Sequence, residues 1–283
     1  MKVGLGLPLD DTESLLDWAV RADAGPFTTL GIADRIPYHN PEPLVTLAAI
    51  AGATSRVRVQ TEVLLAPVRE TVLLAKQAAT LDRISGGRFT LGLGLGGRTD
   101  DYLATGFEQR TRGRRLDQQM ATLRDLWAGR PLSEDVGPIG PLPTTPGGPE
   151  VLFGAFAPPA VDRVGKWGDG LLTAGDPAMT NQLFRAAEQS WETHGRTGRP
   201  RLVAQVNVAF GPDTVTAEAR RNILSYYDFT GEYATRIADA LVTSDAGIRA
   251  VIKAFSDIGA EEVMLYCWST DPHQVDRIAT LIA

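Results

Sequence analysis

The sequence has little of the residues that make covalent or metal crosslinks. Cys267 is the lone cysteine among 283 residues, so no internal disulfide can form. The three histidines are scattered and have no second cysteine near them, so they give no metal-ligand spacing. The stability of the chain must therefore come from its hydrophobic core.

Long apolar runs and an excess of positive charge are also missing. No stretch of about 18 apolar residues occurs, and the first apolar run ends at Pro8, which is too short for a signal peptide. The formal net charge of −6 offers no general attraction to nucleic acid or to an anionic membrane. The composition predicts a cytoplasmic protein whose partner is a small molecule, with no nucleic acid and no membrane.

Short apolar segments alternate with segments of helical periodicity along the chain. Strands are predicted at residues 3–7, 28–33, 57–63, 89–94, 151–154, 170–172, 202–210 and 262–266. Helices are predicted at residues 11–20, 43–54, 70–84, 115–127, 158–167, 177–194, 214–241, 246–258 and 272–282. Strict alternation predicts a parallel sheet. Eight such units favour a single (β/α)8 TIM barrel over residues 1–283, with an open Rossmann-like sheet as the alternative.

Two long connections interrupt this alternation. Residues 95–113 form a predicted loop whose length is typical of functional loops, so it is a candidate rim of a site. Residues 129–150 are rich in proline and glycine and show no helical or strand period. The second segment is therefore predicted to be an excursion over the surface, and the barrel carries both as loop insertions.

Charged residues stand at the predicted C-terminal ends of strands, where barrel enzymes build their sites. Asp34 and Arg35 follow the second strand and either orient a substrate or cofactor or form an ion pair at the rim. Glu62 lies at the end of the third strand, where a carboxylate is costly to bury unless it is paired or used. Arg58 and Arg98 are its candidate partners, so pairing and function both remain open.

A run of glycines follows the fourth strand. Glycine lets backbone N–H groups approach an anion closely, so the run from Gly92 to Gly97 resembles a cradle for a phosphate. Gly92 and Gly94 also lie inside the predicted strand, where small residues serve packing. The spacing does not match a dinucleotide fingerprint, and packing and binding therefore remain alternatives.

Three stretches in the middle of the chain carry a resemblance to a known family. They read LAAIAGATSRVRV, LAKQAATLDRISGGRF and LGLGLGG, and LGIADR and VGKWGDG add to them. These motifs resemble the bacterial luciferase-like family of flavin- and deazaflavin-dependent oxidoreductases, from about Val3 to Gly170. The resemblance implies a TIM barrel that holds a flavin or deazaflavin ring across its mouth.

The resemblance also assigns roles to individual residues. It places Asp34 and Arg35 beside the ring as the catalytic residues. Arg35 stands where a histidine is often found and is expected to hold an anionic substrate or the cofactor. It implies a non-prolyl cis peptide bond between Glu62 and Val63 that backs the ring. The cofactor phosphate is expected at two loops, formed by Gly94, Leu95, Gly96 and Gly97 and by Gly154, Ala155, Phe156 and Ala157. Because Leu95 stands where some flavin-binding members have arginine, phosphate binding is expected to rest on backbone N–H groups, with Arg98 as the substitute cation.

The resemblance predicts a deazaflavin (coenzyme F420) dependent oxidoreductase that transfers hydride between the cofactor and a small organic substrate. The first alternative is an FMN-dependent monooxygenase, which uses reduced flavin and oxygen and needs a flavin reductase as partner. The second alternative, from another class, is a barrel that has lost its cofactor and has a binding role. Family members are commonly dimers, and the alanine-rich faces of the second and third helices are compatible with a homodimer.

Overall fold

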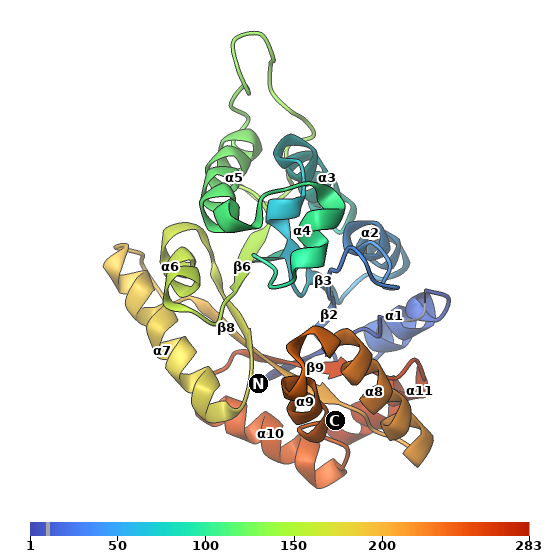
Figure 1. Cartoon of the computed structure of the whole chain (residues 1–283). Helices are drawn as coiled ribbons and strands as arrows, with labels where there is room; N and C mark the ends of the chain where they lie inside the picture. The colour runs from blue at the N-terminus through green and yellow to red at the C-terminus, as the bar shows by residue number, and fades with distance from the viewer. Residues whose placement is uncertain (10–11, 283) are drawn as a thin grey trace.

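Parallel strands form a closed barrel in the computed structural model, which describes residues 1–9 and 12–282. The strands are β1 (Lys2–Gly6), β2 (Thr29–Ile32), β3 (Arg58–Thr61), β4 (Leu64–Leu65), β5 (Phe89–Gly94), β6 (Glu150–Gly154), β7 (Gly170–Ala174), β8 (Arg201–Val208) and β9 (Glu262–Cys267). Their order is β3-β2-β1-β9-β8-β7-β6-β5-β4, and an additional pairing between β3 and β5 closes the ring. The predicted (β/α)8 barrel is confirmed, and the open-sheet alternative is wrong (Figure 1).

The short strand β4 continues the path of β3. The sequence predicts one strand over residues 57–63, but β3 ends at Thr61 and the peptide bond between Glu62 and Val63 is cis. Beyond that bond, Leu64 pairs with Leu93 of β5. The non-prolyl cis bond lies where the family resemblance places it, and β4 is the extra strand of an otherwise eight-stranded barrel.

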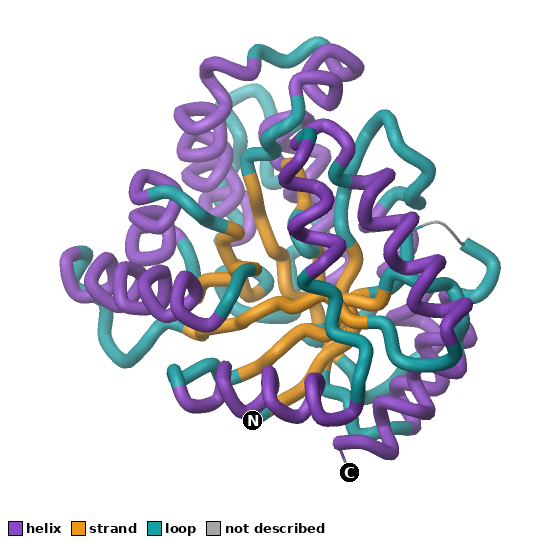
Figure 2. Tube along the Cα trace, turned by 60° about the horizontal axis from the view of Figure 1, so that its bottom comes forward, coloured by secondary structure: helices purple, strands orange, loops and turns teal. Residues whose placement is uncertain are grey.

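Helices surround the barrel on its outer side (Figure 2). They are α1 (Leu15–Ala24), α2 (Pro43–Ala53), α3 (Thr71–Ile84), α4 (Thr99–Thr105), α5 (Arg112–Trp127), α6 (Pro158–Trp167), α7 (Pro177–Thr193), α8 (Asp213–Tyr226), α9 (Glu232–Asp239), α10 (Asp245–Asp257) and α11 (His273–Ile282). Side-chain caps start several of them: Glu42 accepts the Val45 N–H, and Asp176 accepts the Met179 N–H. The start predicted for the first helix at Asp11 lies outside the described residues.

Two predicted segments need correction. The predicted loop at residues 95–113 contains the helix α4 and a 3-10 turn, η2 (Gln109–Thr111). The helix α4 is short and ends at Gly106, whose φ of 74° is left-handed, so it leaves no helical period in the sequence. The predicted helix at 214–241 is two helices, α8 and α9, separated by η3 (Asp228–Thr230) and by Gly231 at φ 60°.

The hydrophobic core has an outer and an inner part. The larger part lies between the barrel and the helices and includes fully buried Trp18, Phe27 and Phe184. A smaller cluster comprises Leu152, Leu172, Val203 and Met264, with Val63 packed against it. Glycines in β1 make room for large neighbours: a Cβ on Gly6 would lie 2.0 Å from the ring of Tyr266.

Residues 129–150 form the surface excursion that the sequence predicts, drawn at the top of Figure 1. Its return path is tied to α3 by Asp82, which accepts hydrogen bonds from the Thr145 N–H at 2.8 Å and from the Thr145 hydroxyl at 2.9 Å. Within the part of the chain that the structure describes, no helix combines the length and apolar character needed to cross a bilayer.

Candidate active site

A pocket of about 390 Å³ opens at the C-terminal ends of the barrel strands. The structure brings all the residues that the sequence assigns to cofactor binding to its wall. They are Glu62, Val63, Gly94, Leu95, Gly96, Gly97, Gly154, Ala155, Phe156 and Ala157. These residues come from three separate strand ends, so the barrel unites what the sequence keeps apart. Their binding of a cofactor stays a prediction.

The glycines of this pocket serve two different purposes. A Cβ on Gly94 would lie 2.3 Å from the Val63 side chain, and one on Gly154 would lie 2.8 Å from it. These two glycines therefore make room for Val63 behind the pocket. Gly96 has a φ of 69°, and a Cβ on Gly97 would meet no atom within 4 Å. Packing against Val63 thus explains why glycines stand at positions 94 and 154. The open space beside the pocket lies at Gly97.

Glu62 carries the ionisable carboxyl group on this wall. Its side chain is buried, and Oε1 accepts a hydrogen bond from Gln60 Nε2 at 2.8 Å. Among the described residues, Oε2 has no hydrogen-bond partner although it is buried. Burial raises the pKa of Glu62 from its ordinary value of 4.5 to about 8, against the opposing effect of the Gln60 hydrogen bond.

The two partners expected for Glu62 do not reach it. Arg58 lies at the start of β3, at the opposite end of the barrel, where it pairs with Glu150 at 3.3 Å. Arg98 pairs instead with Asp100 at 2.6 Å, because both side chains lie at the start of α4. The expectation that either arginine neutralises Glu62 is therefore wrong.

Aromatic side chains form the wall on the other side of the pocket. Tyr266, in β9, and Trp268, directly after it, both line the pocket. Sequence reasoning missed Tyr226 and Tyr227, which also line it from the end of α8. The signal that points to them is an adjacent pair of large aromatic residues at the C-terminal end of a helix.

The phenol groups of this wall stay protonated near neutral pH. Burial raises the pKa of Tyr227 to about 12 and raises the pKa of Tyr226 and of Tyr266 further above the ordinary value of 10.0. The Tyr266 hydroxyl also accepts the Ala33 N–H at 2.8 Å. Among the described lining residues, Glu62 is thus the group whose protonation state changes near neutral pH.

Asp34 and Arg35 lie behind the pocket and do not line it. The Asp34 carboxylate accepts hydrogen bonds from Arg69 Nη2 and from the Leu65 N–H, both at 2.9 Å. Burial raises the pKa of Asp34, and the ion pair with Arg69 opposes that shift. Because Leu65 lines the pocket just after the cis bond, Asp34 fixes the position of this wall.

Arg35 supports the aromatic wall from behind. Its guanidinium lies 5.3 Å from the ring centroid of Tyr226 and 5.4 Å from that of Tyr38, with Asp101 Oδ1 3.4 Å from its Nε. The catalytic roles assigned to Asp34 and Arg35 stay predictions. The contacts of both residues are those of side chains that position pocket walls.

Arg98, the cation expected for the cofactor phosphate, does not line the pocket. Its Nη1 donates to Asp228 at 3.0 Å, and its guanidinium lies 4.5 Å from the ring centroid of Phe229, so it ties the β5 loop to η3. The other predicted phosphate loop runs into α6, whose first two residues are Pro158 and Pro159 and lack N–H groups. No lysine, arginine or histidine occurs among the described residues that line this pocket.

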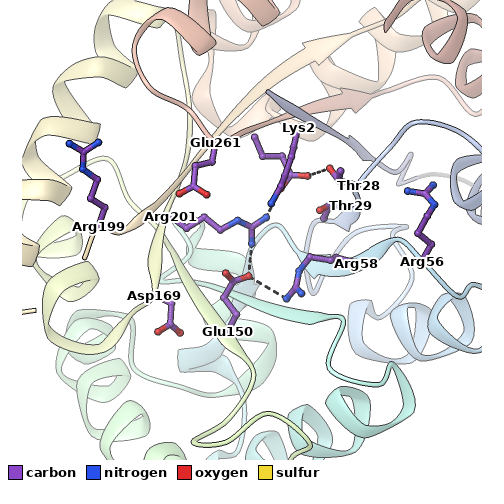
Figure 3. A pocket seen from close by; sticks show the side chains of 11 residues that line it. Lys2, Thr28, Thr29, Arg56, Arg58, Glu150, Asp169, Arg199, Arg201 and Glu261 are labelled. Carbon is purple, nitrogen blue, oxygen red and sulfur yellow. Dashed lines mark hydrogen bonds and ion pairs between the residues drawn. The ribbon is translucent and has the colours of Figure 1, made fainter. Parts of the chain in front are cut away.

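A second cavity, of about 580 Å³, lies at the opposite end of the barrel (Figure 3). Charged side chains from the starts of the strands line it. Arg201 lies between Glu150 and Glu262 and pairs with both, and Arg58 pairs with Glu150. The N-terminal face of a TIM barrel serves stability, and this ion-pair network fits that role.

The chain was also compared with known proteins. A family model described as luciferase-like monooxygenase matches residues 3–281, so the chain belongs to the luciferase-like monooxygenase family. It is 29% identical over 204 residues to an F420-dependent glucose-6-phosphate dehydrogenase of Kribbella flavida, a match that covers 65% of this chain and 60% of the relative. The chain likewise spans 60% of the length of curated mycobacterial relatives that it matches.

Solved structures share the fold over almost the whole chain. A monooxygenase from Streptomyces bottropensis superposes with a TM-score of 0.83 at 22% identity, over 100% of this chain and 97% of the other. An F420-dependent secondary alcohol dehydrogenase, in complex with an F420-acetone adduct, superposes with a TM-score of 0.83 at 17% identity, over 99% and 97%. At such identities the similarity establishes the barrel fold.

Proposed function

We propose that this chain is a deazaflavin-dependent oxidoreductase that transfers hydride between coenzyme F420 and a small organic substrate at the mouth of the barrel. The observation that carries the proposal is the charge of the pocket: its described lining holds one buried carboxyl group and no cationic side chain. The F420-dependent relative supports the same choice of cofactor.

The residues present fit a flavin-type ring. The pocket volume of about 390 Å³ falls in the range of small-molecule sites, roughly 300–1,000 Å³. Val63 and Leu65 form an apolar floor, Tyr226 and Trp268 form an aromatic wall, and the open space at Gly97 leaves room for a side group of the ring. A bound deazaflavin supplies two-electron hydride chemistry, and the protein supplies orientation and electrostatics.

The lack of cations favours the deazaflavin over FMN. FMN ends in a phosphate monoester, which carries nearly two negative charges at neutral pH because its second pKa is about 6. A dianion beside Gly96 and Gly97 has no cationic partner among the described lining residues, so the pocket is poorly suited to the phosphate of FMN.

The remaining side chains hold the site in shape. Asp34 anchors Leu65 through its backbone N–H, and Arg35 supports Tyr226 through its ring face. The buried indole of Trp268 donates to Asn207 Oδ1 at 2.8 Å, which fixes the aromatic wall. These contacts orient the substrate and keep water from the reacting atoms.

A fluorescence titration of the purified chain with F420 and, in parallel, with FMN tests the proposal. We expect F420 to bind at least about tenfold more tightly, which corresponds to about 1.4 kcal/mol. Gly97→Trp fills the open space beside the pocket and should abolish binding. Gly137→Trp is the matched control, because a Cβ at either glycine meets no atom within 4 Å and neither has a positive φ.

The outcomes separate the three predicted functions. Preference for FMN, lost in Gly97→Trp, identifies the monooxygenase alternative and calls for a flavin reductase as partner. If neither cofactor binds, the remaining alternative is a barrel that has lost its cofactor and binds another molecule. Equal loss of binding in Gly97→Trp and Gly137→Trp would show that the cofactor does not bind in this pocket.

A further inference from the structure

The carboxyl group of Glu62 occupies a space built for it. A Cβ on Gly31 would lie 2.1 Å from the Glu62 carboxyl carbon, so a glycine in β2 is what admits this side chain. Gln60, two residues earlier in β3, binds Oε1 and leaves Oε2 buried and unpartnered among the described residues. A buried polar atom without a partner calls for an explanation, and a catalytic role is one such explanation.

The surroundings of Glu62 keep its proton in place. Tyr266 of β9 also lines the pocket and stays a neutral phenol. The charged groups that act on Glu62 from the base of the barrel are Glu262 of β9 and Arg201 of β8, and these two are paired with each other. Their fields oppose one another, so burial dominates and favours the protonated carboxyl group.

No other described residue of the pocket wall changes its protonation state near neutral pH. The three tyrosines hold their protons, and the remaining lining residues are apolar or carry neutral amide, indole or hydroxyl groups. Asp34 lies behind the wall in its ion pair with Arg69. Reduction of a carbonyl group by hydride needs a proton at the oxygen. Glu62 is the most acidic donor among the described lining residues, because burial raises the pKa of the three phenols above their ordinary value of 10.0.

We propose that Glu62 is the proton-transfer group of this site, and that its substrates are uncharged ketones and their secondary alcohols. The proposal rests on the proposed function above. Glu62 lines the pocket at the end of β3, beside the cis bond, and the absence of cationic lining residues disfavours an anionic substrate such as a sugar phosphate.

The step balances as follows in the direction of reduction. A C–H bond forms at the carbonyl carbon with the hydride that the reduced deazaflavin supplies, and the π pair of the C=O bond moves to oxygen. The O–H bond of Glu62 breaks as an O–H bond forms at that oxygen. The substrate gains two electrons and the coenzyme loses two, and solvent returns the proton to Glu62. Alcohol oxidation runs the same step in reverse, with the Glu62 carboxylate as base.

An infrared titration tests the protonation state without any turnover. With ¹³C-labelled glutamate, the wild-type protein should show a carboxylic acid band at pH 7 that disappears with a midpoint near 8. The band should be absent in Glu62→Gln and present in Glu150→Gln, which makes the same substitution at the other end of the barrel. A wild-type midpoint near 4.5 overturns the proposal.

Binding and turnover then separate this proposal from the proposed function. With reduced F420 and a ketone panel from acetone to cyclohexanone, Glu62→Gln should lower kcat by about 10²–10⁴-fold, the usual contribution of a general acid. The dissociation constant for F420 should change by less than about threefold, since the ring and phosphate contacts remain. Glu62→Asp should restore part of kcat, and the wild-type kcat for reduction should fall above pH 8.

Each failure has a distinct meaning. A wild-type protein that binds neither cofactor overturns the proposed function and this proposal with it. Cofactor binding together with an unchanged kcat in Glu62→Gln overturns the role of Glu62 alone. Cofactor binding with turnover of glucose-6-phosphate and of no ketone overturns the substrate class.

Discussion

The two ends of the barrel use the same strands for opposite purposes. At the base, Arg201 bridges Glu150 and Glu262, so the buried charges neutralise each other (Figure 3). At the mouth, Glu62 is buried without a cationic partner in an apolar and aromatic pocket. A buried charge with its partner present is neutralised within the fold, whereas a carboxyl group that is buried alone is costly and marks a candidate site of chemistry. Cavity size does not make this distinction, because the base cavity is the larger of the two.

The largest effect on stability is expected from removing an ion pair at the base of the barrel. Arg201→Met leaves the fully buried Glu262 without its ion-pair partner, which should lower the free energy of unfolding by about 3–5 kcal/mol. Denaturant unfolding measures the loss, and F420 affinity of the folded fraction should be unchanged. Arg249→Ala removes the exposed pair with Asp245 as the control and should cost about 0.5 kcal/mol or less. Equal losses in both variants would show that the base contributes no more than the surface.

The next largest effect on stability is expected from adding a methyl group beside Glu62 at the mouth of the barrel. Gly31→Ala places a methyl group 2.1 Å from the Glu62 carboxyl carbon, so that side chain must move. We expect the free energy of unfolding to fall by about 1–3 kcal/mol, the usual cost of overpacking. Gly52→Ala is the control, because a Cβ there meets no atom within 4 Å and alanine favours the helix by up to about 1 kcal/mol. Thermal unfolding of both variants checks the sign, and a stable Gly31→Ala protein would contradict the position given to Glu62.

The pH dependence of stability follows from the raised pKa of Glu62. The folded chain holds this proton up to about pH 8 and the unfolded chain releases it near 4.5. Stability from this group is therefore complete below pH 4.5 and is lost as the pH rises through 8, with a slope of at most about 1.4 kcal/mol per pH unit. Glu62→Gln should remove this slope between pH 5 and 8. Identical slopes in both proteins would refute the shift.

The smallest effect is expected at Arg98. Because its guanidinium is tied to Asp100 and Asp228, Arg98→Ala should change F420 affinity by less than about threefold. Stability should fall by about 1 kcal/mol or less, as for other partly exposed ion pairs. A tenfold loss of affinity, read in the same fluorescence titration, would instead restore Arg98 as the phosphate partner that the sequence suggests.

The sequence predicts the barrel well because each strand and long helix has its own period and end signals. It does not predict α4 or the break between α8 and α9, because short helices that end at glycines such as Gly106 leave no period. Motifs and glycines located the pocket residues, since these lie just past the strand ends. Tyr226 and Tyr227 were missed because the single helix predicted over residues 214–241 gave no sign that α8 ends at Tyr226. The expected pairing of Glu62 with Arg58 or Arg98 was wrong, since Arg58 lies at the start of β3 and pairs with Glu150, and Arg98 pairs with Asp100.

A crystal structure of the chain grown with oxidised F420 tests the central claim most directly. The account predicts the deazaflavin ring in the mouth pocket, between Val63 and the aromatic wall of Tyr226 and Trp268, with the Glu62 carboxyl group facing the reacting side of the ring. A ring bound anywhere else, or a ring in this pocket with Glu62 turned away from it and paired with an arginine, would contradict the account.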